Sequence, residues 1–258
     1  MAKPKALIVF APGTNCDEET TYCLEQAGAI ADRVLISDLF ESRAKYGDYQ
    51  ILALPGGFSY GDCIAAGRIL ANYLATQLKD LVQEFVRQDK LIIGICNGFQ
   101  TLAHLGFFNG AEGKVTLERN ESLKFECRWV RLRVPDNADS IFVRGITEMW
   151  LPVAHAEGRL VTENRQVLDR LLTSGQVALQ YAAHSGPGEP TYPENPNGSQ
   201  GHVAGLVDSS MRVFGLMPHP ERYFSSRLRF ALTESKPPSA GEETLGLRIF
   251  QNAVSYFS

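Results

Sequence analysis

A cysteine stands between a predicted buried strand and a predicted helix, with a glycine two residues to either side. Cys96 follows the apolar run 91–95 and precedes apolar residues at helical spacing, and Gly94 and Gly98 flank it. This pattern is typical of a nucleophile elbow, a sharp strand-to-helix turn that exposes a nucleophile where neighbouring backbone comes close. A thiol there lies at a helix N-terminus, whose partial positive charge favours the thiolate. Taken alone, the pattern fits a buried structural cysteine equally well.

A histidine and a glutamate lie two residues apart near the end of the chain, after another apolar run. His219 stands between Pro218 and Pro220, and prolines favour extended backbone in the residues before them. Side chains two apart in an extended segment point the same way, so Glu221 would share a face with His219. A carboxylate that orients an imidazole, which takes a proton from a thiol, is what nucleophilic catalysis needs. A proline-stiffened turn with a solvated glutamate is the alternative that this hexapeptide leaves open.

A glycine-rich loop closes a third apolar run. Pro55-Gly56-Gly57-Phe58 follows the predicted strand 51–54, and ligands of parallel α/β sheets bind beyond the carboxyl ends of the strands. Glycines leave backbone N–H groups free to approach a substrate. One of these N–H groups, with that of Asn97, would form an oxyanion hole for a tetrahedral intermediate. A plain turn is the alternative.

The composition is that of an ordinary globular protein. The 258 residues are 44% hydrophobic and 21% charged, and the net charge of -4 gives no reason to expect a nucleic-acid or membrane partner. No apolar run approaches the roughly 20 residues of a membrane span, and no apolar segment after Met1 suggests a signal peptide. Five cysteines without metal-binding spacing indicate reduced thiols and no metal site. We therefore expect a cytoplasmic protein.

The order of the predicted elements favours an α/β fold. The predicted strands lie at 6–10, 34–36, 51–54, 91–95, 129–134, 151–155, 177–181, 203–207 and 213–217, and the predicted helices at 17–28, 69–86 and 244–256. Strands that alternate with helices imply parallel pairing, whereas the later strands form an added antiparallel region. We expect a single domain over residues 1–258 with a mostly parallel central sheet flanked by helices. A surface loop at 184–201 and an irregular polar excursion at 235–243 complete it.

Together these stretches resemble the class I glutamine amidotransferases of the triad type. The resemblance rests on the elbow 94–100 and on the segment 219–221, in the family's order of cysteine, then histidine, then glutamate. Within that family, the motifs at 55–62, 120–130 and 195–199 resemble the glutaminase subunits of phosphoribosylformylglycinamidine synthases, from purine biosynthesis. The resemblance covers nearly the whole chain and implies a flavodoxin-like fold.

The resemblance also implies a role for each residue of the site. Cys96 would attack the side-chain amide of L-glutamine, His219 would transfer the proton, and Glu221 would orient His219. The N–H groups of Gly57 and Asn97 would form the oxyanion hole. Three further residues are predicted to bind the substrate: Gly56, Phe58 and Gln100.

A partner is implied as well. The ammonia would pass to the synthetase subunit of phosphoribosylformylglycinamidine synthase, which converts formylglycinamide ribonucleotide to its amidine, and a small accessory subunit is a further candidate. No cofactor is expected in this chain, because no ATP-binding motif is recognisable; ATP and magnesium are expected on the synthetase subunit. His155 and Glu157 are further candidates for lining the site or a surface that faces the partner.

Three other interpretations remain open at this point. One is a class I amidotransferase subunit of another pathway. Another is a cysteine-nucleophile α/β hydrolase acting on esters or lactones, which shares the elbow but has its acid before the histidine, whereas Glu221 follows it. The last is a flavodoxin-like binding or stress-response domain with an oxidisable Cys96, which would not need His219.

Replacement of Cys96 by alanine is expected to abolish glutamine-dependent activity, because Cys96 alone among the five cysteines has the elbow and the helix N-terminus that favour a thiolate. On the sequence alone, alanine should be tolerated at the other four cysteines: Cys16, Cys23, Cys63 and Cys127. The check is mass-spectrometric mapping of the thiol that a glutamine-analogue electrophile labels first. First labelling at Cys63 or Cys127 would contradict the assignment.

Overall fold

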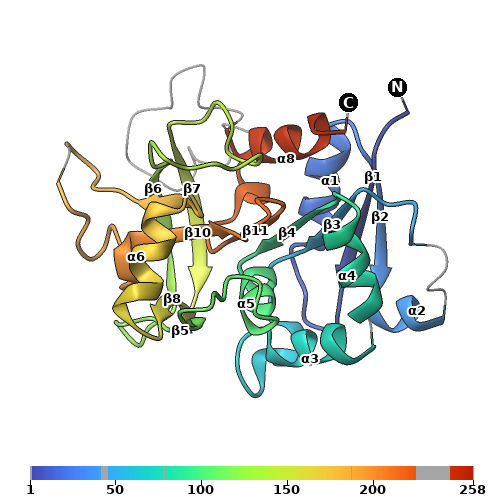
Figure 1. Cartoon of the computed structure of the whole chain (residues 1–258), viewed down its shortest axis with the longest axis horizontal. Coiled ribbons are helices and arrows are strands. Elements are labelled where there is room, and N and C mark those ends of the chain that lie inside the picture. The colour runs from blue at the N-terminus through green and yellow to red at the C-terminus, as the bar shows by residue number, and fades with distance from the viewer. Residues whose placement is uncertain (1, 42–45, 78, 187, 225–244, 258) are drawn as a thin grey trace.

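The computed structural model describes residues 2–41, 46–77, 79–186, 188–224 and 245–257. They form one nine-stranded sheet, a separate two-stranded sheet and the helices that cover them (Figure 1). The strands are β1 (Lys5–Phe10), β2 (Ile30–Leu35), β3 (Ile51–Leu54), β4 (Leu91–Ile95), β5 (Val115–Arg119), β6 (Glu126–Arg133), β7 (Glu148–His155), β8 (Glu157–Thr162), β9 (Val177–Tyr181), β10 (Val203–Val207) and β11 (Val213–Leu216). The helices are α1 (Asp17–Gln26), α2 (Ile36–Glu41), α3 (Arg68–Gln77), α4 (Lys79–Arg87), α5 (Asn97–His104), α6 (Arg165–Thr173) and α8 (Leu245–Ser255).

Half of the main sheet is parallel, in the order β2-β1-β3-β4-β11. β3, β4 and β11 are buried along their whole length, as expected of short apolar strands covered on both faces. Because β2 and β3 flank β1 on opposite sides, connections of the same hand place α1 on one face and α3 with α4 on the other. The strand order therefore reverses between β1 and β3. In such sheets the ligand crevice opens there, at the carboxyl ends of the strands.

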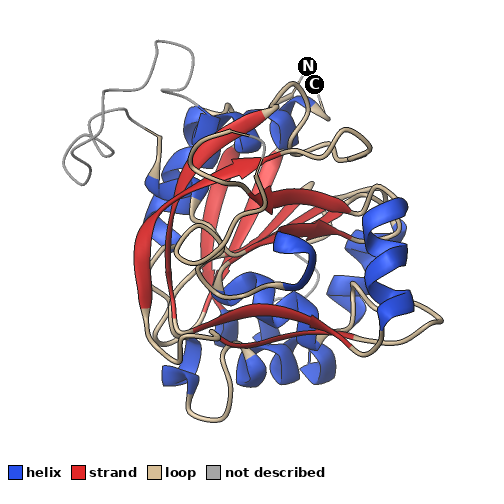
Figure 2. Ribbon diagram, turned by 90° about the vertical axis from the view of Figure 1, so that its left-hand side faces the viewer, coloured by secondary structure: helices blue, strands red, loops and turns tan. Residues whose placement is uncertain are grey.

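The other half of the main sheet is antiparallel. β10, β9, β6 and β7 continue from β11, and each pairs antiparallel with its neighbour. In β7, buried positions alternate with more exposed ones, the period predicted for these strands. The ribbon of β5 and β8 lies apart from the main sheet (Figure 2). The α/β fold with an added antiparallel region is confirmed.

Several element boundaries differ from prediction, and two of these differences concern the parallel half of the sheet and its helices. The segment 69–86, predicted as one amphipathic helix, contains the two helices α3 and α4. Both bury one face, so the apolar period continues across them and could not locate the break. The second strand, predicted at 34–36, begins earlier, because β2 spans Ile30–Leu35 and α2 starts at Ile36.

The predicted surface loop 184–201 is partly an interior segment. Asn195, Pro196, Asn197 and Ser199 are buried. The fully buried Asn197 side chain donates to the Gly158 carbonyl and to the Tyr181 hydroxyl, at 2.8 and 3.1 Å. Turn-forming residues usually lie at the surface, but here hydrogen bonds to strands replace those to water. The predicted excursion at 235–243 lies outside the described residues.

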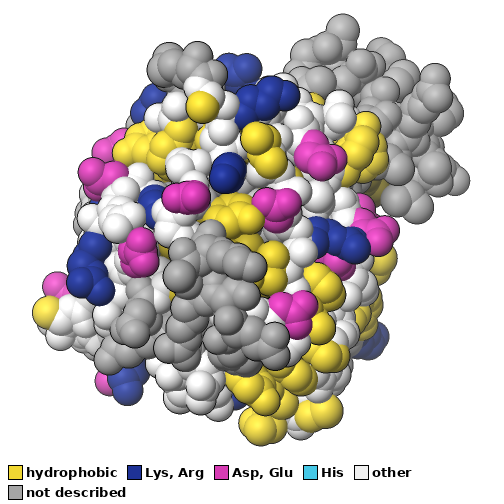
Figure 3. Space-filling view, turned by 90° about the vertical axis from the view of Figure 1, so that its right-hand side faces the viewer, with side chains coloured by type: hydrophobic (Ala, Val, Ile, Leu, Met, Phe, Trp, Pro, Cys, Tyr) yellow, Lys and Arg dark blue, Asp and Glu magenta, His cyan; other side chains and the backbone are white. Residues whose placement is uncertain are grey.

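The surface shown in Figure 3 mixes acidic, basic and apolar side chains over the described residues. The two chain ends lie close together in both ribbon views (Figures 1 and 2). Within the described ranges, each helix is too short or too polar to cross a lipid bilayer.

Candidate active site

Cys96 lies at the tip of a sharp turn between β4 and α5. Its φ of 51° and ψ of -103° lie outside the regions that residues with side chains normally adopt. Glycines make the turn possible: a Cβ on Gly98 would overlap the Leu54 carbonyl oxygen, and one on Gly94 would lie 2.6 Å from the Gly98 oxygen. Strained backbone of this kind clusters at functional sites. The elbow geometry predicted from the sequence is therefore present, and Cys96 is only 4% exposed.

His219 and Glu221 form a buried hydrogen-bonded pair. His219 Nδ1 lies 2.6 Å from Glu221 Oε1, and both side chains are almost fully buried. His219 is extended, with φ -104° and ψ 90°, as expected before a proline. The predicted extended backbone ends there, because Pro220–Arg222 form a 3-10 turn, η4. The contact is thus made by a turn that brings the carboxylate back to the ring.

The second ring nitrogen of His219, Nε2, is the atom that can interact with the Cys96 thiol. His219 Nε2 is buried and makes no well-formed hydrogen bond within the described part of the chain, while the Cys96 thiol lies near enough to interact with the ring. Burial opposes protonation of the ring, but the Glu221 carboxylate and the neighbouring thiols overcome this and raise the pKa of His219 well above its usual value. His219 is therefore a base that can accept the thiol proton.

β7 and β11 hold these two residues side by side. The backbone N–H of His219 donates to the Pro152 carbonyl at 2.8 Å, and the Cys96 thiol faces the Ala154 carbonyl at 3.9 Å. The backbone N–H of Cys96 donates to the Leu216 carbonyl at 2.7 Å. The elbow and the histidine segment are thus tied to the same strand ends.

The loop after β1 holds the glycine-rich loop after β3. Gly57 forms an isolated antiparallel bridge with Thr14, and the Gly56 carbonyl accepts from the N–H groups of Asn15 and Cys16 at 3.3 and 3.2 Å. Gly57 has φ 143°, and a Cβ there would lie 2.7 Å from the Asn15 nitrogen. The hydrogen bonds of this bridge come from the neighbours of Gly57, so its own N–H points away from the β1 loop. That N–H is available as an oxyanion donor.

Asn97 and Gln100 connect α5 to neighbouring segments. Asn97 opens the helix, so its backbone N–H has no acceptor within it. Its side chain accepts from the Ser59 hydroxyl at 2.5 Å and donates to Gln100 Oε1 at 3.1 Å. Gln100 Nε2 donates to the Glu157 carbonyl at 2.7 Å. Gln100 thus has a structural role that the sequence did not predict. Its contact with substrate stays a prediction. The contact of Phe58 with substrate also stays a prediction, and this side chain is 42% exposed.

Two residues that the sequence analysis left out of the site lie beside the histidine, one against its ring and the other against the first. Cys16 Sγ lies 3.8 Å from His219 Nδ1, and the Arg222 guanidinium donates to the same sulfur at 3.0 Å. Burial raises the pKa of the Cys16 thiol, so the sulfur is neutral there. Cys16 and His219 are 203 residues apart, which hides the contact. The one feature of the sequence that could have indicated this contact is the position of Cys16, which follows the loop at the carboxyl end of a parallel strand.

Cys16, His219 and Glu221 also carry donor atoms within 4.8 Å of one another, a set that a metal ion could use. The Arg222 cation at the Cys16 sulfur would repel a metal ion, and Glu221 already occupies His219 Nδ1. We therefore interpret these groups as parts of one hydrogen-bonded cluster.

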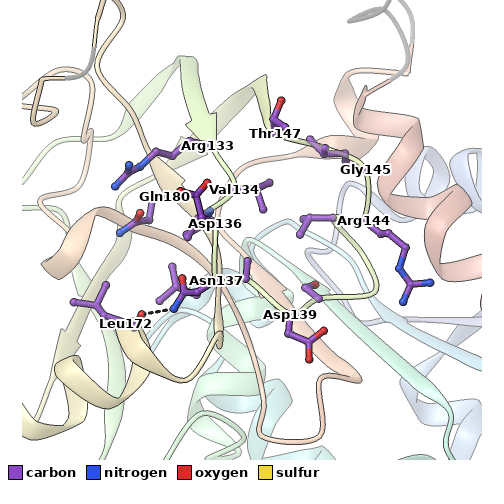
Figure 4. Close-up of a pocket in the computed structure, with 16 residues that line it drawn as sticks. Arg133, Val134, Asp136, Asn137, Asp139, Arg144, Gly145, Thr147, Leu172 and Gln180 are labelled. Atoms are coloured by element: carbon purple, nitrogen blue, oxygen red, sulfur yellow. Dashed lines mark hydrogen bonds between the residues drawn. The ribbon is translucent and has the colours of Figure 1, made fainter.

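A large cavity of about 950 Å³ lies elsewhere, between the end of β6, the loop at 135–147 and α6 (Figure 4). Asn137 on this loop donates to the Leu172 carbonyl at 2.8 Å. The cysteine, histidine and glutamate of the site do not line this cavity. The chemistry of the side chains, and not cavity size, therefore locates the candidate active site.

Comparison with known proteins agrees with this site. A family model described as the CobB/CobQ-like glutamine amidotransferase domain matches residues 3–257. The chain belongs to this family. Two relatives of this glutamine amidotransferase are phosphoribosylformylglycinamidine synthase subunits PurQ, from Dehalococcoides mccartyi and Methanococcus maripaludis. They are 41% and 39% identical, over 99% of this chain and 98% of each relative.

Solved structures support the glutamine amidotransferase fold. A chain of the PurLQS structure from Thermotoga maritima is 32% identical, with a TM-score of 0.73 and both chains fully covered. A glutamine amidotransferase from Thermotoga maritima is only 13% identical, with a TM-score of 0.55 and 99% of this chain and 98% of that chain covered. That second likeness concerns the fold alone. The predicted family is confirmed.

Replacement of Cys16 by alanine is expected to lower kcat/KM for glutamine about 10-fold, because Arg222 loses its acceptor and His219 its neighbour. This revises the expectation from the sequence, in which Cys16 was dispensable. The exposed Cys63 provides the matched control, since its replacement by alanine should leave the kinetics unchanged. Equal rates for the two variants would show that Cys16 does not position His219.

Proposed function

We propose that the chain hydrolyses L-glutamine to glutamate and ammonia as the glutaminase subunit of a phosphoribosylformylglycinamidine synthase. The observation that carries this is the strained elbow at Cys96 beside the buried pair of His219 and Glu221. Full-length similarity to PurQ subunits at about 40% identity supports the same function. The acceptor reaction is the ATP-dependent conversion of formylglycinamide ribonucleotide to its amidine.

The reaction proceeds through a thioester. Cys96 Sγ attacks the amide carbon as its proton passes to His219, and the N–H groups of Gly57 and Asn97 stabilise the oxyanion. His219 returns the proton to the leaving nitrogen, the C–N bond breaks, and ammonia departs. Water, activated by His219, then cleaves the glutamyl thioester. Glu221 stabilises the imidazolium and fixes the ring. Gly56, Phe58 and Gln100 complete the substrate site.

The family and the site geometry weigh against the other interpretations. An α/β hydrolase has its acid before the histidine, whereas Glu221 follows His219 and contacts it. A binding domain would have no need of a buried acid–base pair next to an elbow thiol. A subunit of another pathway is less well supported than a purine-pathway subunit, given the names of the two full-length relatives.

The proposal includes partners. A synthetase subunit receives the ammonia and carries ATP and magnesium, and a small accessory subunit completes the assembly in the cytoplasm. Ammonia is mostly protonated at neutral pH and is then no nucleophile, so release into water would waste glutamine. A glutaminase that serves a synthetase therefore gains by staying slow until its partner is loaded.

The Gly56–Gly57 peptide is the element whose orientation a partner could change. Among the described residues its carbonyl accepts two long backbone hydrogen bonds, from Asn15 and Cys16 at 3.3 and 3.2 Å. Because both residues are glycines, rotation of the peptide meets little steric resistance. Rotation would move the Gly57 N–H, which the proposed mechanism uses as an oxyanion donor. Partner binding at this loop would thus change the rate of the first chemical step.

The isolated chain is expected to have weak glutaminase activity. Addition of the synthetase subunit, loaded with nucleotide and formylglycinamide ribonucleotide, should raise kcat by about 10-fold or more, through the change at the glycine loop. Steady-state release of glutamate, measured on the chain alone and titrated with partner, is the test. The Cys96→Ala variant is the control: its complex should use ammonium salts but not glutamine. Full turnover without any partner would indicate a stand-alone amidase.

Replacement of Glu221 by glutamine is expected to lower kcat/KM by about 10²-fold and to move the acid limb of its pH profile to lower pH. The carboxylate is what raises the pKa of His219 against the effect of burial, so its loss lowers that pKa. Replacement of His219 by alanine should cost more, because base and acid are both lost. A profile for Glu221→Gln that coincides with that of the unsubstituted chain would rule out the assigned role.

A further inference from the structure

His155, a second buried histidine, lies next to the reacting groups but has no part in the triad. It is the last residue of β7 and is 2% exposed. The preceding carbonyl, of Ala154, is 3.9 Å from the Cys96 thiol. The ring packs against Gly158, where an added Cβ would lie 3.1 Å from His155 Nδ1 and 2.7 Å from the Met217 methyl. Met217 stands two residues before His219, so the His155 ring borders the same site.

Hydrogen bonds fix the tautomer of this ring. Asn120, which is fully buried, donates both amide hydrogens to backbone carbonyls, of Lys124 at 2.9 Å and of His155 at 2.8 Å. Its Oδ1 is therefore the atom that faces His155 Nδ1, at 3.0 Å. An amide oxygen only accepts, so His155 Nδ1 carries the hydrogen. His155 Nε2 is left with a lone pair.

That lone pair is unsatisfied. His155 Nε2 is buried and has no hydrogen-bond partner among the residues that the structure describes. Buried acceptors without a donor are rare, because the lost hydrogen bonds to water are then not replaced. Burial and the positive charge of His219 also lower the pKa of His155 to about 3, so the ring is neutral at every working pH. A fixed, neutral acceptor without an N–H donor among the described residues thus lies beside the site.

We propose that His155 Nε2 accepts a hydrogen bond from the leaving nitrogen of glutamine and holds the ammonia as it forms. The inference rests on the proposed glutaminase function, which brings an N–H donor to the site in the leaving nitrogen itself. As the C–N bond breaks, the nitrogen keeps its two amide hydrogens and receives a third from His219. One of these hydrogens points to His155. Because the imidazole is neutral, it binds ammonia without giving it a proton, and the product stays nucleophilic.

The test compares two leaving groups in the assembly with the synthetase subunit. Glutamine and the γ-methyl ester of glutamate form the same thioester. The ester, however, releases methanol instead of ammonia, and its leaving group carries no N–H. The parameter kcat/KM covers the steps up to release of the first product, and the two substrates differ only in those steps. His155→Phe retains a planar ring and removes the acceptor. We expect a fall in kcat/KM of about 10- to 100-fold for glutamine and little change for the ester.

The ester reaction shows in the same experiment that the variant is folded and has its triad in place. His184→Phe, at an exposed imidazole whose centroid lies 5.1 Å from that of the Trp150 ring, is the matched control and should change neither reaction. Equal losses with both substrates would overturn the proposal and place His155 against the common glutamyl part. No loss with either would overturn it as well. If the unsubstituted assembly released glutamate from neither compound, the proposed function itself would fail.

Discussion

The strained backbone at Cys96 is the constraint on which the rest of the site depends. A residue with a side chain can hold φ 51° and ψ -103° only if its surroundings leave no alternative. The parallel pairing of β3 with β4 supplies those surroundings, because Gly98 fits directly against the Leu54 carbonyl at the end of β3. On the other side, Gly215 of β11 leaves room for the Phe99 ring beneath α5. Three strand ends and one helix thus fix a single backbone geometry.

The second requirement is electrostatic, because the histidine pair is buried almost completely. A buried charge pair is costly unless each partner is well placed. The Glu221 carboxylate compensates the ring charge at 2.6 Å, and both side chains are almost fully removed from solvent. Cys16 and Arg222 lie next to this pair, and the neutral Cys16 sulfur stands between the Arg222 guanidinium and the His219 ring. In such a dry site the pair and the thiol interact strongly, which favours transfer of the thiol proton.

The sequence could predict those features that depend on local pattern. The elbow at Cys96 and the parallel strands follow from short apolar runs and flanking glycines, both of which are local. The contact of Glu221 with His219 was predicted correctly, but from extended geometry, whereas a 3-10 turn makes it. Two features were missed because they depend on contacts between distant segments. Cys16 reaches His219 across 203 residues, and the polar segment 195–199 is buried by hydrogen bonds to strands.

The antiparallel half of the sheet explains why this chain needs more than an elbow and a parallel sheet. It contributes none of the triad residues on its own strands, yet β7 binds the backbone of His219 through Pro152 and faces the Cys96 thiol through Ala154. Gln100 of α5 is bonded to the Glu157 carbonyl at the start of β8, so the helix behind the nucleophile is held from the same side. The strand ends of the parallel half can place a nucleophile and a base. It is β7, rigid through its full pairing with β6, that fixes the distance between them.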